Sequence, residues 1–190
     1  MDYRAYYDLE GYLFGTVTQR FADQGFLDAF DLFCIVVWKA NRSKSLFAER
    51  LRKQSGTDDL EQAARRLTEG ITRQPDAPQR LKYLWSEKPW GFRLATASAI
   101  LTVLYPDEFT IYDDRVCEQL RDCADFRKLR NLTSFDKLWE GYQEFTRVVK
   151  QQTPGGLSLR DKDRYLWGKS FHDQLTHDIA RRFSLVANHQ

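Results

Sequence analysis

Two adjacent carboxylates in the second half of the chain lie in a sequence context that suits a catalytic acidic side chain. They lie in the segment Tyr112-Asp113-Asp114-Arg115-Val116, where either aspartate can cap the start of a predicted helix. Backbone amides at a helix start keep a nearby carboxylate ionised. An ionised carboxylate held in place stabilises a developing positive charge or orients an attacking water. We take Asp113 as the candidate catalytic residue; the alternative is that it is only a helix cap.

A glycine-containing break precedes this acidic pair. The segment Lys88-Pro-Trp-Gly-Phe-Arg93 separates two predicted helices, and the second of these is rich in small residues. A glycine lets the backbone approach a phosphate closely, and the amides that open the next helix point at the anion with the helix dipole behind them. We therefore expect Gly91, Phe92 and Arg93 to hold a phosphate. The alternative is a turn between packed helices.

Positive charge is concentrated in one short segment of a chain that is nearly neutral. The chain has 29 Lys and Arg residues against 27 Asp and Glu, which gives a net charge of +2. Between residues 39 and 53 the only acid is Glu49, and the basic residues are Lys39, Arg42, Lys44, Arg50, Arg52 and Lys53. Such a patch favours contact with an anionic partner. The alternative is a solvated helix face.

The hairpin and the acidic segment together resemble the helix-hairpin-helix DNA glycosylase superfamily. Its signature is a hairpin of the form L-P-G-V-G-x-K-T-A, an apolar helix, and then a catalytic V-D-x-H/R-V. With Trp90-Gly-Phe-Arg93 set on P-G-V-G, Thr96-Ala97 falls on T-A and Ala95 on the lysine. The family's spacing between that lysine and its catalytic aspartate then places the aspartate at Asp113. The resemblance covers residues 81–120, so it concerns only a minor part of the chain.

This resemblance implies a protein that binds double-stranded DNA, extrudes a damaged or modified base and hydrolyses its N-glycosidic bond. Breaking that bond builds positive charge on the sugar, which Asp113 would stabilise. Ala95 stands where bifunctional members carry a Schiff-base lysine, so the expected activity is monofunctional. Arg93 replaces the second hairpin glycine. The four cysteines of the iron–sulfur branch are missing, and no cofactor is expected.

A fainter match lies upstream, in the segment that runs from Val36 to Ser43. It occupies the place of the family's helix-to-helix junction, which supplies the side chain that fills the hole left by the extruded base. The resemblance makes Asn41 and Arg42 the residues that enter the duplex. The positive charge of the basic segment makes Lys39 and Lys44 further expected DNA contacts.

The elements that must position these residues are all predicted to be helices. Apolar residues recur at steps of three and four, and convincing alternating strands are absent. A capping box of Asp58 and Glu61 is expected to open one helix, and a short extended piece to precede the acidic pair. The expected helices span residues 3–21, 26–39, 43–54, 58–73, 79–86, 94–105, 114–122, 135–149 and 159–186. The fold class is therefore all-α, with a helix-hairpin-helix glycosylase-like arrangement implied by the resemblance.

Length and composition predict a single helical domain over residues 1–190. Three cysteines without C-x-x-C spacing and the lack of an apolar leader favour a cytoplasmic, intracellular protein, and no apolar run is long enough for a membrane span. His172 and His177 lack the spacing of a helical metal pair, so no metal site is expected. Two other functions stay open: a non-catalytic DNA-binding module of the same fold, and a helical protein-interaction domain.

Overall fold

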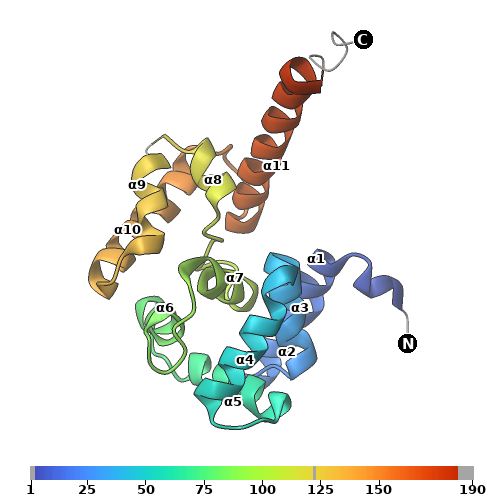
Figure 1. The fold of residues 1–190 in the computed structure, drawn as a ribbon, viewed down its shortest axis with the longest axis vertical. Helices are drawn as coiled ribbons and strands as arrows, with labels where there is room; N and C mark the ends of the chain where they lie inside the picture. Colours follow the sequence, from blue (N-terminus) through green and yellow to red (C-terminus); the bar gives the residue numbers. More distant parts are fainter. Residues whose placement is uncertain (1–2, 122, 184–190) are drawn as a thin grey trace.

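Every regular element in the part of the chain that the computed structural model describes, residues 3–121 and 123–183, is a helix. No strand occurs among these residues, which confirms the all-α prediction. The helices form two groups, with α1 to α7 in one and α8 to α11 in the other, and an extended segment after α7 joins them (Figure 1). No helix within the described ranges is long and apolar enough to cross a membrane.

The helix bounds lie close to those that the sequence predicts. The first group comprises η1 (Tyr3–Tyr6), α1 (Leu9–Gly11), the π-helix η2 (Tyr12–Val17), α2 (Thr18–Gln24), α3 (Ala29–Ala40), η3 (Asn41–Ser43), α4 (Lys44–Ser55), α5 (Leu60–Thr72), α6 (Ala77–Trp85) and α7 (Leu94–Leu104). The second comprises α8 (Asp114–Gln119), α9 (Cys123–Lys128), η4 (Leu129–Asn131), α10 (Phe135–Gln151), α11 (Leu159–His177) and the π-helix η5 (Asp178–Phe183).

Three local predictions need correction. The residue that caps α5 is Asp59 rather than Asp58, because the Asp59 carboxylate accepts the amides of Glu61 and Gln62. Glu61 does not complete a capping box but accepts the amide of Ala29 at the start of α3. The helix expected over residues 114–122 already ends at position 119, and the sequence did not predict α9; position 122 lies outside the described residues.

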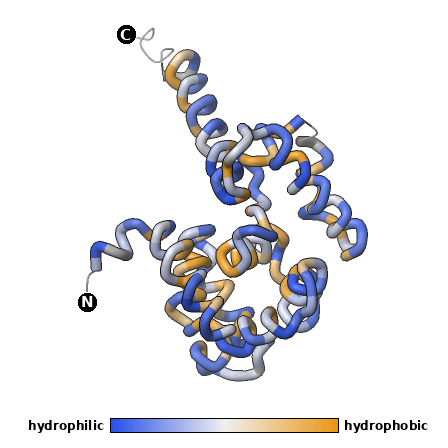
Figure 2. The backbone as a smooth tube through the Cα atoms, turned by 180° about the vertical axis from the view of Figure 1, so that it is seen from behind, coloured by the Kyte–Doolittle hydropathy of each residue, from blue (hydrophilic) through white to orange (hydrophobic). Residues whose placement is uncertain are grey.

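The small-residue helix α7 lies at the centre of the first group. Nine of its eleven residues are buried. The segments with the most hydrophobic residues lie around α7 and α3 (Figure 2). Small side chains let neighbouring helices approach closely, and the buried hydroxyls find backbone partners. Thr18 on α2 donates to the Val103 carbonyl, with 2.7 Å between the oxygens. Ser98 accepts the amide of Tyr112, with 3.0 Å between oxygen and nitrogen.

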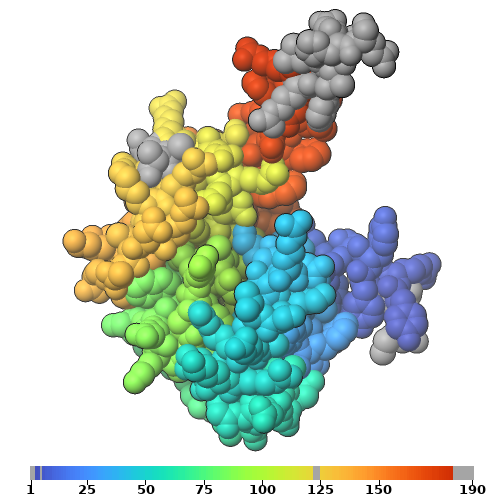
Figure 3. Space-filling model, in the orientation of Figure 1, coloured from blue at the N-terminus to red at the C-terminus, as the bar shows by residue number. Residues whose placement is uncertain are grey.

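The extended segment between α7 and α8 is fixed from both sides. From α10, the fully buried Tyr142 hydroxyl donates to the Thr110 carbonyl and accepts the Thr110 amide. The Tyr112 hydroxyl donates to the Phe126 carbonyl at 2.8 Å. Together with the bond from Ser98, these contacts anchor the backbone up to the residue before Asp113. The second group continues into α11, which projects beyond the rest of the molecule (Figures 1 and 3).

Candidate functional site

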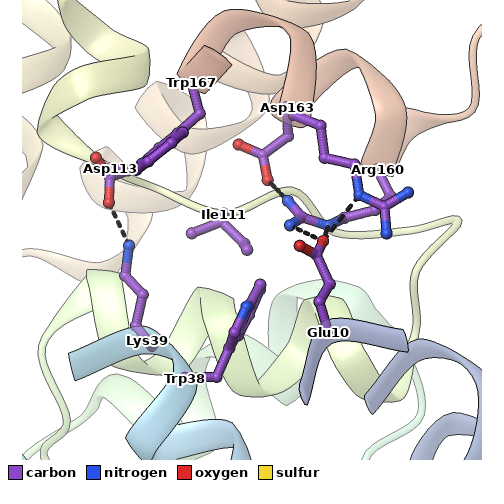
Figure 4. Close-up of a pocket in the computed structure, with 9 residues that line it drawn as sticks. Glu10, Trp38, Lys39, Ile111, Asp113, Arg160, Asp163 and Trp167 are labelled. Atoms are coloured by element: carbon purple, nitrogen blue, oxygen red, sulfur yellow. Dashed lines mark hydrogen bonds and ion pairs between the residues drawn. The ribbon is translucent and has the colours of Figure 1, made fainter. Parts of the chain in front are cut away.

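Asp113 lies at the wall of a cavity of about 340 Å³ between the two groups of helices (Figure 4). Four parts of the chain form this cavity: α1, the end of α3, the extended segment that leads into α8, and α11. The lining residues are Glu10, Trp38, Lys39, Ile111, Asp113, Arg160, Asp163, Arg164 and Trp167. The size is at the lower end of that of small-molecule sites. Two indole rings line the cavity, but six of its nine lining residues are charged.

Two donors hold the Asp113 carboxylate in place. Its Oδ1 accepts the Arg115 amide at 2.9 Å, which is the cap of α8, and its Oδ2 accepts the Lys39 ammonium at 2.5 Å. Burial opposes ionisation, but the Lys39 charge and the Arg115 amide outweigh it, so the pKa of Asp113 is lowered. Asp113 is therefore an ionised, oriented carboxylate that faces a cavity, with its side chain 25% exposed.

The neighbouring carboxylate has a different place. Asp114 pairs with Arg130 through Nη1 at 3.0 and 3.2 Å, and more than half of its side chain is exposed. It does not belong to the cavity wall. Of the two acidic residues in the motif, the structure brings only Asp113 to a site where a ligand can bind.

Lys39 is in a different environment from the other basic residues of its segment. The basic segment predicts a DNA contact for Lys39, but its side chain is only 16% exposed and its ammonium group faces Asp113 inside the cavity (Figure 4). The expected role as an outer phosphate contact therefore needs correction. The reason is the tertiary contact between the end of α3 and the start of α8, which no local pattern reveals.

The opposite wall is a cluster of charges from α1 and α11. Arg160 and Arg164 both donate to Glu10 Oε1, and Arg160 also donates to Asp163. Burial disfavours the charged form of Glu10, but its two arginine partners outweigh this effect and lower its pKa. Each of these four residues belongs to the cavity lining. The N-terminal helix is thereby tied to α11 across the site.

Indole rings form the apolar part of the site. The guanidinium of Arg160 lies 5.1 Å from the Trp38 ring centre, which fixes that ring against α11. Trp167 stacks on Phe171 and is 46% exposed, so its ring stands at the cavity wall and reaches solvent. Planar ligands stack well on such rings. Ile111 completes the wall between them (Figure 4).

The hairpin of residues 88–93 is present, but two of its predicted phosphate contacts need correction. Gly91 has φ +63°, and its amide donates to the Ser86 carbonyl at 2.7 Å. The Phe92 amide donates to Leu84, and the Phe92 ring is buried in a stack with Phe47. Both amides are thus used inside the hairpin and do not point at a phosphate.

The start of α7 keeps donors for an anion. Arg93 is exposed at the N-cap position, where its side chain makes no capping bond. The amides of Leu94 and Ala95 are in the first turn, where no carbonyl of the same helix can reach them. Beside them a groove of about 590 Å³ runs between the hairpin and α4, and Arg50 and Lys53 are part of its lining. Glu49 and Glu87 line the same groove, so the surface between α4 and the start of α7 carries charges of both signs.

The junction between α3 and α4 follows the cavity-lining Lys39 directly in the sequence. Asn41 and Arg42 form the exposed turn η3, only two and three residues beyond the cavity-lining Lys39. Lys44 is exposed as well and donates to the Asn41 side chain at 3.0 Å. The structure thus places all three outside the cavity but close to Lys39 in sequence.

Within residues 3–121 and 123–183, no group of three or more His, Cys, Asp and Glu side chains is placed to hold a metal ion. Although three carboxylates line the cavity, each of them is paired with a Lys or Arg side chain.

Besides Trp38 and Ile111, five residues of the site were not predicted from the sequence: Glu10, Arg160, Asp163, Arg164 and Trp167. They come from the two ends of the chain, outside the segment that carries the family resemblance. Comparison of the chain with models of protein families, with curated proteins and with solved structures finds no match. The function must therefore be inferred from the chemistry of the residues themselves.

Proposed function

We propose that this protein is a DNA glycosylase-like enzyme with a helix-hairpin-helix arrangement, which extrudes one nucleotide from duplex DNA and hydrolyses its N-glycosidic bond. The observation that carries the proposal is the place of Asp113. The position that the motif assigns to the catalytic aspartate holds an ionised carboxylate, and this carboxylate faces a cavity with aromatic walls. Motif and cavity are independent features of the chain, and they coincide at one residue.

In this mechanism the extruded base enters the cavity and lies against the indole rings of Trp38 and Trp167. As the bond between C1′ and the base nitrogen lengthens, positive charge develops on the sugar. The Asp113 carboxylate stabilises this charge or orients the water that attacks C1′. Lys39 keeps the carboxylate ionised and fixes its orientation. The products are a free base and an abasic site in an intact strand.

The exposed basic residues support the binding of duplex DNA. Arg42 and Lys44 lie at the α3–α4 junction, and Arg93 lies at the start of α7. Phosphate groups neutralised by such side chains position a duplex without reading its sequence. Asn41, in the turn beside Arg42, is the side chain that enters the base stack in this proposal.

The direct test is base release from synthetic duplexes that carry one damaged or modified base each. After incubation with the protein, alkali converts abasic sites into strand breaks, which are resolved by electrophoresis. Release of at least one base supports the proposal. Salt-dependent binding of duplex DNA without release of any base would instead indicate a non-catalytic DNA-binding module. Absence of binding would favour a protein-interaction domain.

We expect the product strands to stay intact until heat or alkali is applied. Ala95 cannot form an imine with the sugar, and Lys39, the lysine of the cavity wall, is an ammonium group paired with Asp113. Incubation with borohydride should therefore give no covalent protein–DNA adduct on a denaturing gel. An adduct that disappears in Lys39→Met would contradict the monofunctional mechanism and identify the amine. An adduct that persists in that variant would point to Lys88, which is exposed in the hairpin.

Replacing both Arg42 and Lys44 by alanine should weaken DNA binding and flatten its salt dependence. Each lost phosphate contact removes up to about 0.9 from the slope of log K against log salt. Fluorescence anisotropy at several salt concentrations measures this slope. The matched control replaces Lys137 and Lys150, two exposed lysines on α10, and should leave the slope unchanged. Equal slopes for the two double variants would show that the α3–α4 junction does not contact DNA.

A further inference from the structure

A second acidic side chain faces the cavity from the side opposite Asp113. Asp163, on α11, points into the same space, with Ile111 between the two carboxylates (Figure 4). Its Oδ2 accepts a hydrogen bond from Arg160. The side chain is only 3% exposed, so the protein covers nearly all of its surface and little of it is open to the cavity.

Burial and nearby positive charges act on both carboxylates, but their balance shifts the two pKa values in opposite directions. The charged groups that face Asp163 are Arg160 from its own helix, Lys39 from α3 and Asp113 from the start of α8. Glu10 from α1 shares Arg160 with it. Burial raises the pKa of Asp163 to about 6 against the pull of Arg160 and Lys39, and the negative charge of Asp113 adds to this rise. The pKa of Asp113, in contrast, is lowered.

Two titratable groups whose environments push their protonation states apart can share the roles of acid and base in one reaction. We infer that Asp163 is the general acid that protonates the departing base, on the opposite side of the cavity from the carboxylate that serves the sugar. This inference rests on the proposed glycosylase function. It adds a catalytic residue from a part of the chain that the family resemblance does not cover.

The step balances as a hydrolysis. The C1′–N bond breaks and its electron pair leaves with the base, while the Asp163 carboxyl proton moves to a nitrogen of the base. Water adds its oxygen to C1′ and gives a proton to Asp113. Exchange with solvent then returns Asp163 to its acid form and Asp113 to its ionised form. One water is consumed, and no oxidant or cofactor is needed.

A proton donor beside the leaving group defines the class of substrate. A neutral purine departs poorly as an anion, so protonation of a ring nitrogen assists its release. N7-methylguanine already carries a positive charge and departs as a neutral base without a donor. The substrate assigned to this cavity is therefore a purine nucleotide whose base is uncharged in DNA.

The test compares these two kinds of leaving group in the full-length protein. Duplexes carry one hypoxanthine, 8-oxoguanine, unpaired adenine or N7-methylguanine each, and base release is measured under single-turnover conditions. Asp163→Asn should lower the release of the neutral purine by about 10²-fold, the usual contribution of a general acid. Release of N7-methylguanine should change by less than about threefold. Asp173→Asn, an exposed position on the same helix, is the matched control and should alter neither rate.

The pH dependence of the unmodified protein provides a second measurement, which does not require any variant to fold. For a neutral purine, kcat/KM should fall as the pH rises above about 6, because the Asp163 carboxyl loses the proton that it must donate. For N7-methylguanine this alkaline limb should be missing. In a folded Asp163→Asn protein the limb should be missing for the neutral purine as well.

Several results would overturn the inference. Equal loss of both activities in Asp163→Asn, with the circular dichroism spectrum and melting temperature unchanged, would give Asp163 a positioning role only. The same alkaline limb for both bases would also contradict it. Release of pyrimidines or of N7-methylguanine alone would refute the inference while the proposed function stands. Release of no base at all would refute both.

Discussion

Replacing Asp113 by asparagine is expected to slow base release by about 10²-fold or more, while the affinity for duplex DNA stays the same or increases. The rate falls because a neutral amide no longer stabilises positive charge on the sugar, and losses of this order follow the removal of a positioned electrostatic group. The affinity is kept or increased, since the substitution removes one negative charge near the phosphates and leaves the Lys39 ammonium without its partner. Single-turnover base release and anisotropy titrations measure the two quantities separately.

Asparagine is the appropriate replacement because it preserves the local structure. Asp113 caps α8 through the Arg115 amide, and asparagine caps helices about as well as aspartate. The matched control is Asp114→Asn, which removes the adjacent charge from an exposed pair with Arg130. Activity that survives in Asp113→Asn and is lost in Asp114→Asn would show that Asp114 is the catalytic carboxylate. Full activity in both variants would rule out the enzyme proposal.

The helices could be predicted because their signals are local. Apolar spacing, capping residues and breaks at Gly and Pro place most helix ends within a few residues of those observed. The exceptions also have local causes. The carboxylate of Asp59 competes with that of Asp58 for the same free amides, and Asp59 makes the bonds. The hairpin glycine was found, but the sequence did not show that its amide would close the turn on Ser86.

The site could be predicted only where one segment carries it. Asp113 was found because the motif and the helix cap lie in consecutive residues. Lys39 was assigned to the outer surface because its neighbours in sequence are basic, whereas its ammonium group faces a carboxylate 74 positions away. Asp163 has no local signal, since an aspartate on a polar helix is normally exposed. A helical period shows which face is buried, but it does not show which residue of another helix that face meets.

Lys39 is the residue whose replacement should change the pH dependence of the reaction most. Its ammonium charge lowers the pKa of Asp113 through the direct ion pair and opposes the rise in the pKa of Asp163 across the cavity. In Lys39→Met a side chain of similar length without charge fills the same space. Both carboxyl groups then hold their protons to higher pH, because burial is no longer opposed by this positive charge.

The expected result for Lys39→Met is a shift of the whole pH profile to higher pH. The acid limb moves up because Asp113 must be ionised to act, and the alkaline limb moves up because Asp163 must be protonated. At pH 5, loss of a charge-assisted bond of about 1.5–3 kcal/mol should reduce base release on the order of 10- to 100-fold, and the loss should be smaller at pH 7.

Single-turnover rates on a duplex with one neutral purine, measured from pH 4.5 to 9, give both limbs. Lys137→Met, an exposed site on α10, should leave both limbs in place. Unmoved limbs in Lys39→Met, or a shift to lower pH, would show that Lys39 does not set the charge of the two carboxylates and that its contact with Asp113 is only structural.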